Sequence, residues 1–171
     1  MKKLTERDLY EPVKDCLMKM LKMGHNNGHL EITADGNYSE ALKHLIHDDI
    51  VFSWLVKAAP DLTGCILKKG VDIRNARGSD VEDFIAGEIK SEKIKLPDIY
   101  QAKMYGDLFC AKYTLLISPK NIGEEIRRLH ESIYILNRFR GWKVYVGQAF
   151  IEPFGDSIIV NDIIWCPETP F

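Results

Sequence analysis

The sequence predicts an α/β protein in which helices flank a central mixed β-sheet. Three observations support this fold class. Segments with apolar residues at helical spacing alternate with short runs of β-branched and aromatic residues. The chain has 171 residues, of which 46% are hydrophobic, which is typical of one domain with its own core. It contains no internal repeat or low-complexity linker, so residues 1–171 are expected to form a single domain.

The first third of the chain is expected to alternate helices and strands up to Pro60. The expected elements are a helix over Leu9–Leu21 that stops at Gly24, a strand over His29–Thr33, a helix over Tyr38–Asp48, and an apolar stretch over Ile50–Ala59 that is either helix or strand. Pro12 is expected in the first turn of the first helix, where proline is tolerated. Pro60 ends the apolar stretch because proline disfavours a helical conformation in the preceding residue.

The rest of the chain supplies most of the expected sheet. The expected elements are strands over Leu62–Lys68 and Phe84–Lys90, a helix over Pro97–Cys110, a strand over Tyr113–Ser118, a helix from Asn121 to about Arg140, and strands over Trp142–Ile151 and Ser157–Trp165. Asn121 is expected to cap its helix. The elements that follow the first helix thus include the series strand, strand, helix and strand, formed by Leu62–Lys68, Phe84–Lys90, Pro97–Cys110 and Tyr113–Ser118.

Charge and cysteine content exclude several classes of protein. The formal net charge is -2, far from that of a strongly basic nucleic-acid coat protein. Apolar runs fall short of the ~20 residues needed to span a bilayer, and the charged N-terminus is unlike a signal peptide. The four cysteines are scattered without a Cys-x-x-Cys pair, which indicates reduced thiols. We therefore expect a cytoplasmic protein without membrane contact.

One constellation of residues indicates chemistry. Asp61 begins one predicted strand, and Glu88-Ile89-Lys90 ends the next. Side chains alternate along a strand, so Glu88 and Lys90 share a face. If the two strands are neighbours, Asp61 and Glu88 face each other, and two close carboxylates repel unless a cation lies between them. Such oxygen ligands favour Mg²⁺, and an adjacent lysine suits metal-assisted attack of water on a phosphodiester.

The same residues resemble the signature of the PD-(D/E)XK nuclease superfamily. The resemblance rests on Ala59-Pro60-Asp61 followed by Glu88-Ile89-Lys90, and on Gln101 and Tyr105, which are similar to the Gln-x-x-x-Tyr motif of one branch. It covers residues 9–118 and includes the opening helix of small prokaryotic members. Residues 119–171, expected to form the C-terminal helix and strands, match no motif. The resemblance implies a restriction-endonuclease-like core and a Mg²⁺- or Mn²⁺-dependent endo- or exodeoxyribonuclease.

The resemblance also implies a role for each residue. Asp61, Glu88 and the Ile89 carbonyl would bind the metal, and Lys90 would position or activate the attacking water. Gln101 and Tyr105 would orient Lys90 or contact the substrate. Glu11, on the first helix, is either a further metal ligand or a solvated acid near a helix start.

Binding residues and alternative functions are less specific. The basic residues predicted to contact nucleic acid, with DNA favoured over RNA, are Lys68, Lys69, Arg74 and Arg77. They lie in the loop between the motif strands and are expected to flank the proposed site. A second basic group, Arg127, Arg128, Arg138, Arg140 and Lys143, is either a solvated helix face, which we favour, or an edge that contacts phosphates. His44 and His47 are also expected to lie on a solvated helix face. The alternative function is an inactive nucleic-acid-binding or assembly module on the same fold. A third possibility is a homodimer that pairs through the apolar segment Ile158–Trp165.

Overall fold

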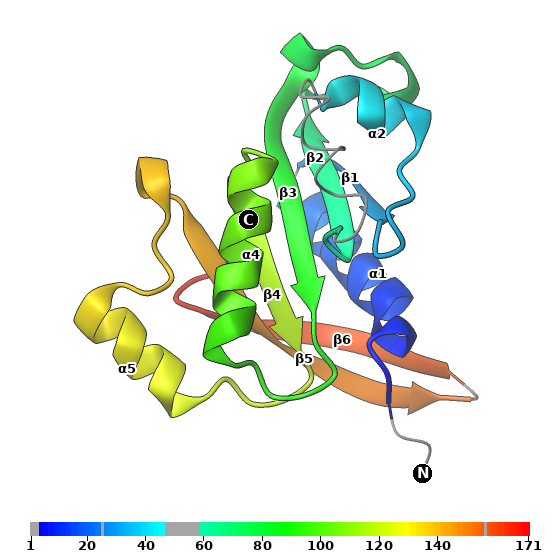
Figure 1. Ribbon diagram of the computed structural model, residues 1–171. Helices are drawn as coiled ribbons and strands as arrows, with labels where there is room; N and C mark the ends of the chain where they lie inside the picture. Colours follow the sequence, from blue (N-terminus) through cyan, green and yellow to red (C-terminus); the bar gives the residue numbers. More distant parts are fainter. Residues whose placement is uncertain (1–3, 25, 47–58, 156) are drawn as a thin grey trace.

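The computed structural model describes residues 4–24, 26–46, 59–155 and 157–171. Its helices are α1 (Arg7–Met23), α2 (Glu40–Leu45), α4 (Leu96–Leu108) and α5 (Glu124–Ile133), with single 3-10 turns η2 (Ile73–Asn75), η3 (Gly78–Asp80) and η4 (Phe139–Gly141). Its strands are β1 (Asn27–Ile32), β2 (Leu62–Leu67), β3 (Val81–Ile89), β4 (Tyr113–Ser118), β5 (Lys143–Phe154) and β6 (Ser157–Cys166). The fold is therefore α/β, with helices flanking one sheet (Figure 1).

The six strands form one mixed, curled sheet in the order β1-β2-β3-β4-β5-β6. The first three strands pair antiparallel, β3, β4 and β5 run parallel, and β6 returns antiparallel to β5. Parallel neighbours need a crossover connection, and α4 and α5 provide the two crossovers. The predicted mixed sheet is confirmed.

Helices pack on both faces of the sheet. Helix α1 covers one face, where its Leu9, Val13 and Leu17 pack against strand residues that include Ile85 and Leu115. The opposite face is covered by α2, α4 and α5 in two further apolar clusters. Glu88 is one residue from Ile89, which packs on the α1 face, so strand alternation turns Glu88 toward the α4 face.

Several helix boundaries differ from the sequence-based expectation; α2, for example, begins at Glu40 and not at Tyr38. Pro12 lies in the second turn of α1, not the first, because the helix begins at Arg7. The predicted helix from Asn121 to Arg140 is shorter at both ends: Gly123 is its N-cap, and it stops at Ile133, after which Tyr134 adopts a left-handed conformation (φ 55°). The apolar periodicity misled here because Leu136 is buried from a turn that follows the helix.

Arg138 also contradicts the prediction of a solvated basic face. Its guanidinium side chain is only 1% exposed and pairs with Asp107 of α4 at 2.7 Å. It also donates to the Ala111 carbonyl at 2.6 Å and to Thr114 Oγ1 at 2.7 Å. The residue therefore joins the C-terminal end of α4 to β4 and the segment after α5.

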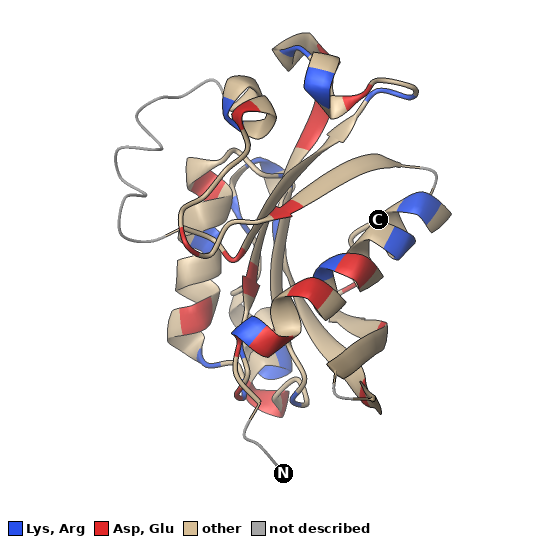
Figure 2. Ribbon diagram, turned by 90° about the vertical axis from the view of Figure 1, so that its right-hand side faces the viewer, with Lys and Arg blue, Asp and Glu red and all other residues tan. Residues whose placement is uncertain are grey.

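The structure also bears on the charge of helix α1 and on membrane spans. Along α1, acidic and basic residues lie side by side, so this helix presents no face of a single charge (Figure 2). None of the helices that the structure describes is long and apolar enough to cross a membrane. The prediction for the apolar stretch 50–59 falls almost entirely outside the described residues, as does that for His47.

Candidate active site

The candidate site forms where β2 begins and β3 ends. The antiparallel register pairs Leu62 with Gly87, and its continuation by one residue places Asp61 opposite Glu88. Residues directly opposite in such a pair have Cβ atoms about 5 Å apart on the same face of the sheet. Pro60 and Asp61 are both buried at this end of the two strands. The strand pairing on which the sequence argument depended is therefore present.

Backbone groups join the two carboxylate-bearing segments. The Ile89 N–H donates to Asp61 Oδ2 at 2.7 Å, while the Lys90 N–H donates to the Ile117 carbonyl on the other side of β3 at 2.8 Å. The N–H and C=O of one strand residue point to the same neighbouring strand. The Ile89 carbonyl thus leaves β3 on the Asp61 side, as a metal ligand there requires.

Lys90 is held between the strand and helix α4. Its ammonium Nζ lies 3.0 Å from Glu88 Oε2 and 3.2 Å from Gln101 Oε1. Tyr105 follows Gln101 by one helical turn, interacts with its side chain, and is almost fully buried. The structure thus brings together five of the predicted residues: Asp61, Glu88, Lys90, Gln101 and Tyr105.

Burial makes the two acids difficult to ionise together. Glu88 is 3% exposed, and its burial, followed by the charge of Asp61, raises its pKa to about 7. Burial likewise raises the pKa of Asp61, although the Ile89 N–H and the Tyr10 hydroxyl partly offset this effect. Burial alone would lower the pKa of Lys90, but the Glu88 carboxylate outweighs it and the pKa is raised. Near neutral pH, the site therefore holds one ammonium group and a partly protonated acid pair.

The residues at this site fit a hard divalent cation. Glu88 Oε1 is buried without a hydrogen-bond partner, and buried polar atoms of this kind call for an explanation such as an ion. Two carboxylates with a backbone carbonyl match the oxygen ligands of Mg²⁺, which retains several waters. Within the described ranges, no group of three or more His, Cys, Asp and Glu side chains is arranged to hold a metal, so the fit depends on the carbonyl and on water.

Helix α1 and its N-cap residue contribute side chains that the sequence argument missed. The Tyr10 hydroxyl interacts with the Asp61 carboxylate, and that contact, after burial, raises the tyrosine pKa. Glu6 acts on the pKa of both Asp61 and Lys90 through its charge. Glu6 and Tyr10 are four residues apart and so share a helix face. This spacing was a usable signal in the sequence.

Glu11 points elsewhere. It follows Tyr10 by one residue, which turns it about 100° around the helix. It pairs with Lys14 at 2.5 Å and lines a groove between α1 and residues Ser157–Val160 of β6. The structure therefore favours the solvated helix acid over the extra metal ligand.

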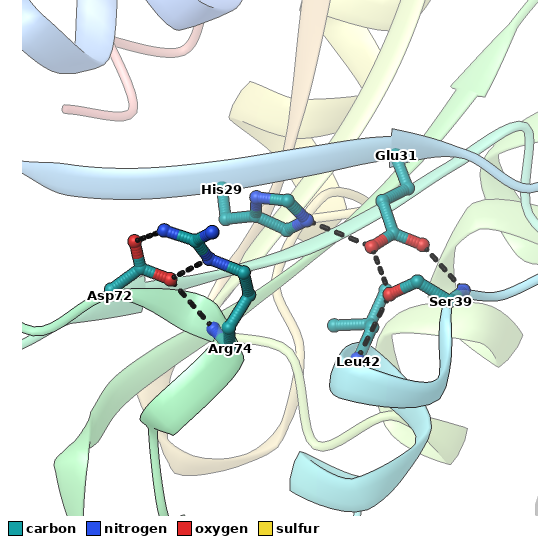
Figure 3. A network of polar contacts seen from close by, with 6 residues as sticks. All are labelled: His29, Glu31, Ser39, Leu42, Asp72 and Arg74. Carbon is teal, nitrogen blue, oxygen red and sulfur yellow. Dashed lines mark hydrogen bonds and ion pairs between the residues drawn. The ribbon is translucent and has the colours of Figure 1, made fainter.

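The predicted basic loop lies at the far end of the hairpin from the carboxylates. The β2–β3 connection, which carries Lys68, Lys69, Arg74 and Arg77, is at the top of Figure 1, whereas β3 ends much lower in the view, close to β6 and the first turns of α1. The six residues of β2 span about 20 Å. Arg74 is moreover paired with Asp72 at 2.7 Å (Figure 3). These residues do not flank the site, contrary to the expectation.

A second polar cluster, His29, Glu31 and Ser39, contains the residue types of a hydrolase triad but not its geometry (Figure 3). Ser39 Oγ bonds to Glu31 Oε1 at 2.5 Å and accepts from the Leu42 N–H at 3.1 Å. A nucleophilic serine would instead be bonded to the histidine. His29 contacts Glu31 at 2.8 Å. The cluster therefore serves as the N-cap of α2 and fixes that helix to β1.

In comparisons with protein-family models, curated proteins and solved structures, the chain matches none. The function has to be inferred from the arrangement of its own residues.

Proposed function

We propose that the protein is a metal-dependent nuclease that hydrolyses phosphodiester bonds of DNA and belongs to the PD-(D/E)XK superfamily. The observation that carries the proposal is the convergence of Asp61, Glu88 and Lys90 at the adjoining ends of β2 and β3. The proposed restriction-endonuclease-like core comprises α1, the antiparallel β2–β3 pair, α4 and the parallel strand β4. We place its activity in the cytoplasm, where four free cysteines stay reduced.

Each residue has a defined task in this proposal. Asp61, Glu88 and the Ile89 carbonyl hold Mg²⁺ or Mn²⁺, which when bound supplies Lewis-acid activation of water and of the scissile phosphate. Gln101 fixes the ammonium group of Lys90 from α4. Lys90 then orients the attacking water and neutralises negative charge that develops on the phosphate. Tyr105 restrains Gln101 from the buried side of α4.

The test is cleavage of labelled single-stranded, duplex and branched DNA, and of RNA, with Mg²⁺, Mn²⁺ or EDTA. The wild type should cut DNA only with a divalent cation, and Lys90→Ala should reduce the rate about 100-fold or more. Lys93→Ala is the matched control, because Lys93 is exposed and pairs with Glu125. If Lys90→Ala cuts every substrate as fast as Lys93→Ala does, the catalytic assignment is wrong.

The alternative is an inactive module that binds nucleic acid on the same fold. The ion pair between Lys90 and the buried Glu88 favours it, because the ammonium group already compensates one carboxylate without a metal. Calorimetric titration with Mn²⁺ separates the two functions. Under the nuclease proposal, the wild type binds the ion and Asp61→Asn does not. Under the alternative, neither protein does.

A further inference from the structure

A tight turn between α5 and β5 combines aromatic rings with arginines. Trp142 N–H donates to the Phe139 carbonyl at 3.2 Å, and Arg138 N–H donates to the Trp142 carbonyl at 2.7 Å. Both central residues have positive φ, 59° at Arg140 and 75° at Gly141, as a type I′ turn requires. The turn places Phe139 and Trp142 next to each other, with ring centroids 5.5 Å apart.

The identity of residue 140 is not explained by the turn. Type I′ turns prefer Asn, Asp or Gly at this position, and positive φ is unfavourable for a side chain as large as arginine. The Arg140 guanidinium lies 5.3 Å from the Phe139 ring centroid and 5.5 Å from that of Trp142. Among the residues that the structure describes, no carboxylate forms an ion pair with it. Backbone strain that folding does not require points to a function for the side chain.

The turn is attached to a rigid part of the fold. Arg138, which precedes it, is anchored in the interior by Asp107 and Thr114. Phe139, in contrast, is 47% exposed, so the core does not account for its ring. A rigid frame that presents an aromatic face and an unpaired guanidinium group is suited to a planar, negatively charged partner.

Helix α4 continues this surface toward the candidate active site. On its outer side, the Lys103 ammonium lies 5.8 Å from the ring centroid of exposed Tyr100. The helix rises about 9 Å between Gln101 and Asp107. Gln101 contacts Lys90, and Asp107 contacts Arg138. The second half of α4 thus connects the candidate active site to the turn over a distance of a few nucleotides.

We propose that the turn formed by Phe139, Arg140, Gly141 and Trp142 is a binding site for single-stranded nucleic acid. An unpaired base stacks on the exposed Phe139 ring, and the Arg140 guanidinium binds the adjacent phosphate. Bases in a duplex are stacked on their neighbours and cannot offer this face. DNA and RNA share this chemistry. The proposal deepens the nuclease function, on which it rests for the kind of polymer bound.

The test is fluorescence anisotropy of labelled oligothymidylate, oligouridylate and a DNA duplex in EDTA, where no cleavage takes place. Phe139→Ala removes the stacking ring. Arg140→Asn removes the guanidinium group but installs the residue that the turn prefers, so the fold is retained or stabilised. The matched control is Phe154→Ala, because Phe154 is also an exposed phenylalanine but lies at the tip of the β5–β6 hairpin.

Phe139→Ala and Arg140→Asn should each weaken binding of single strands about 10-fold, and Phe154→Ala should leave it unchanged. Arg140→Asn should also lower the slope of log affinity against log salt by about 0.7, the value for one phosphate contact to a single strand. Unchanged affinity in both variants, or equal affinity of the wild type for the duplex, would overturn the proposal. If the turn instead binds a protein or a second copy of the chain, both variants should bind single strands as tightly as the wild type does. Because the assay needs neither metal nor cleavage, it can succeed even if the nuclease assignment fails.

Discussion

The substitution Glu88→Gln tests whether the candidate site reduces the stability of the metal-free protein. In the folded protein, burial and the charge of Asp61 raise the Glu88 pKa from 4.5 to about 7. The folded state therefore holds this proton more tightly than the unfolded state does. The favourable contribution is complete below the unfolded pKa and is lost as the pH rises toward 7. At about 1.4 kcal/mol per pKa unit, ionisation of Glu88 then lowers the free energy of unfolding by about 3 kcal/mol.

Glutamine resembles the protonated acid, so the variant should escape this loss. In urea denaturation with EDTA, the wild type and Glu88→Gln should have similar free energies of unfolding at about pH 4, below the unfolded pKa of 4.5. The variant should become more stable than the wild type as the pH rises, by up to about 3 kcal/mol at about pH 8. Glu82→Gln is the control, because Glu82 lies on the same strand but is exposed. A difference between Glu88→Gln and the wild type that stays constant with pH would refute the reasoning.

Three further predictions concern the metal ligands, Arg138 and Gly64. In thermal denaturation, Mn²⁺ at 100 times its dissociation constant should stabilise the wild type and Glu11→Gln by about 2.7 kcal/mol. It should not stabilise Asp61→Asn. If Glu11→Gln also fails to respond, Glu11 is a metal ligand after all. Arg138→Met should lower the free energy of unfolding by about 3 kcal/mol or more, because it leaves the polar groups around Arg138 unpaired. The control is Arg128→Met. Because Arg128 is exposed, this substitution should change the free energy of unfolding by less than about 1 kcal/mol. Gly64→Ala should cost about 1–3 kcal/mol in urea denaturation, since a Cβ there would lie 2.0 Å from the His29 carbonyl oxygen; wild-type stability would show that β1 shifts freely.

The sequence predicted the strands better than the helix ends. The short apolar run defined Tyr113–Ser118 without error, because a buried strand between a polar turn and Pro119 has few alternative interpretations. The helix after Pro119 was predicted too long because Ile135 and Leu136 are buried from a turn, and their spacing extends the helical pattern. The capping residue was missed as well, since Gly123 provides no side-chain signal.

For the candidate site, the pattern of residues located the strand ends but not the surrounding side chains. Asp61, Glu88 and Lys90 could be placed together because they lie at the ends of two consecutive strands that pair antiparallel. The contribution of α1 was missed because it depends on how that helix is rotated against the sheet. The adjacent residues Tyr10 and Glu11 point in directions about 100° apart around the helix. The loop that carries Lys68 was expected near the site, but a hairpin of this length separates its turn from its open end by about 20 Å.

The arrangement of Asp61 and Glu88 is itself an argument for a ligand. A loss of about 3 kcal/mol is a large fraction of the 5–15 kcal/mol by which domains are typically stable, and an uncharged side chain at position 88 would avoid it. Lys90 compensates only part of the charge, because it contacts Glu88 Oε2 and leaves Oε1 buried without a partner. A divalent cation between the carboxylates would use that oxygen and favour ionisation of both acids. The same two acids that destabilise the metal-free fold above about pH 7 would therefore stabilise the metal-bound protein.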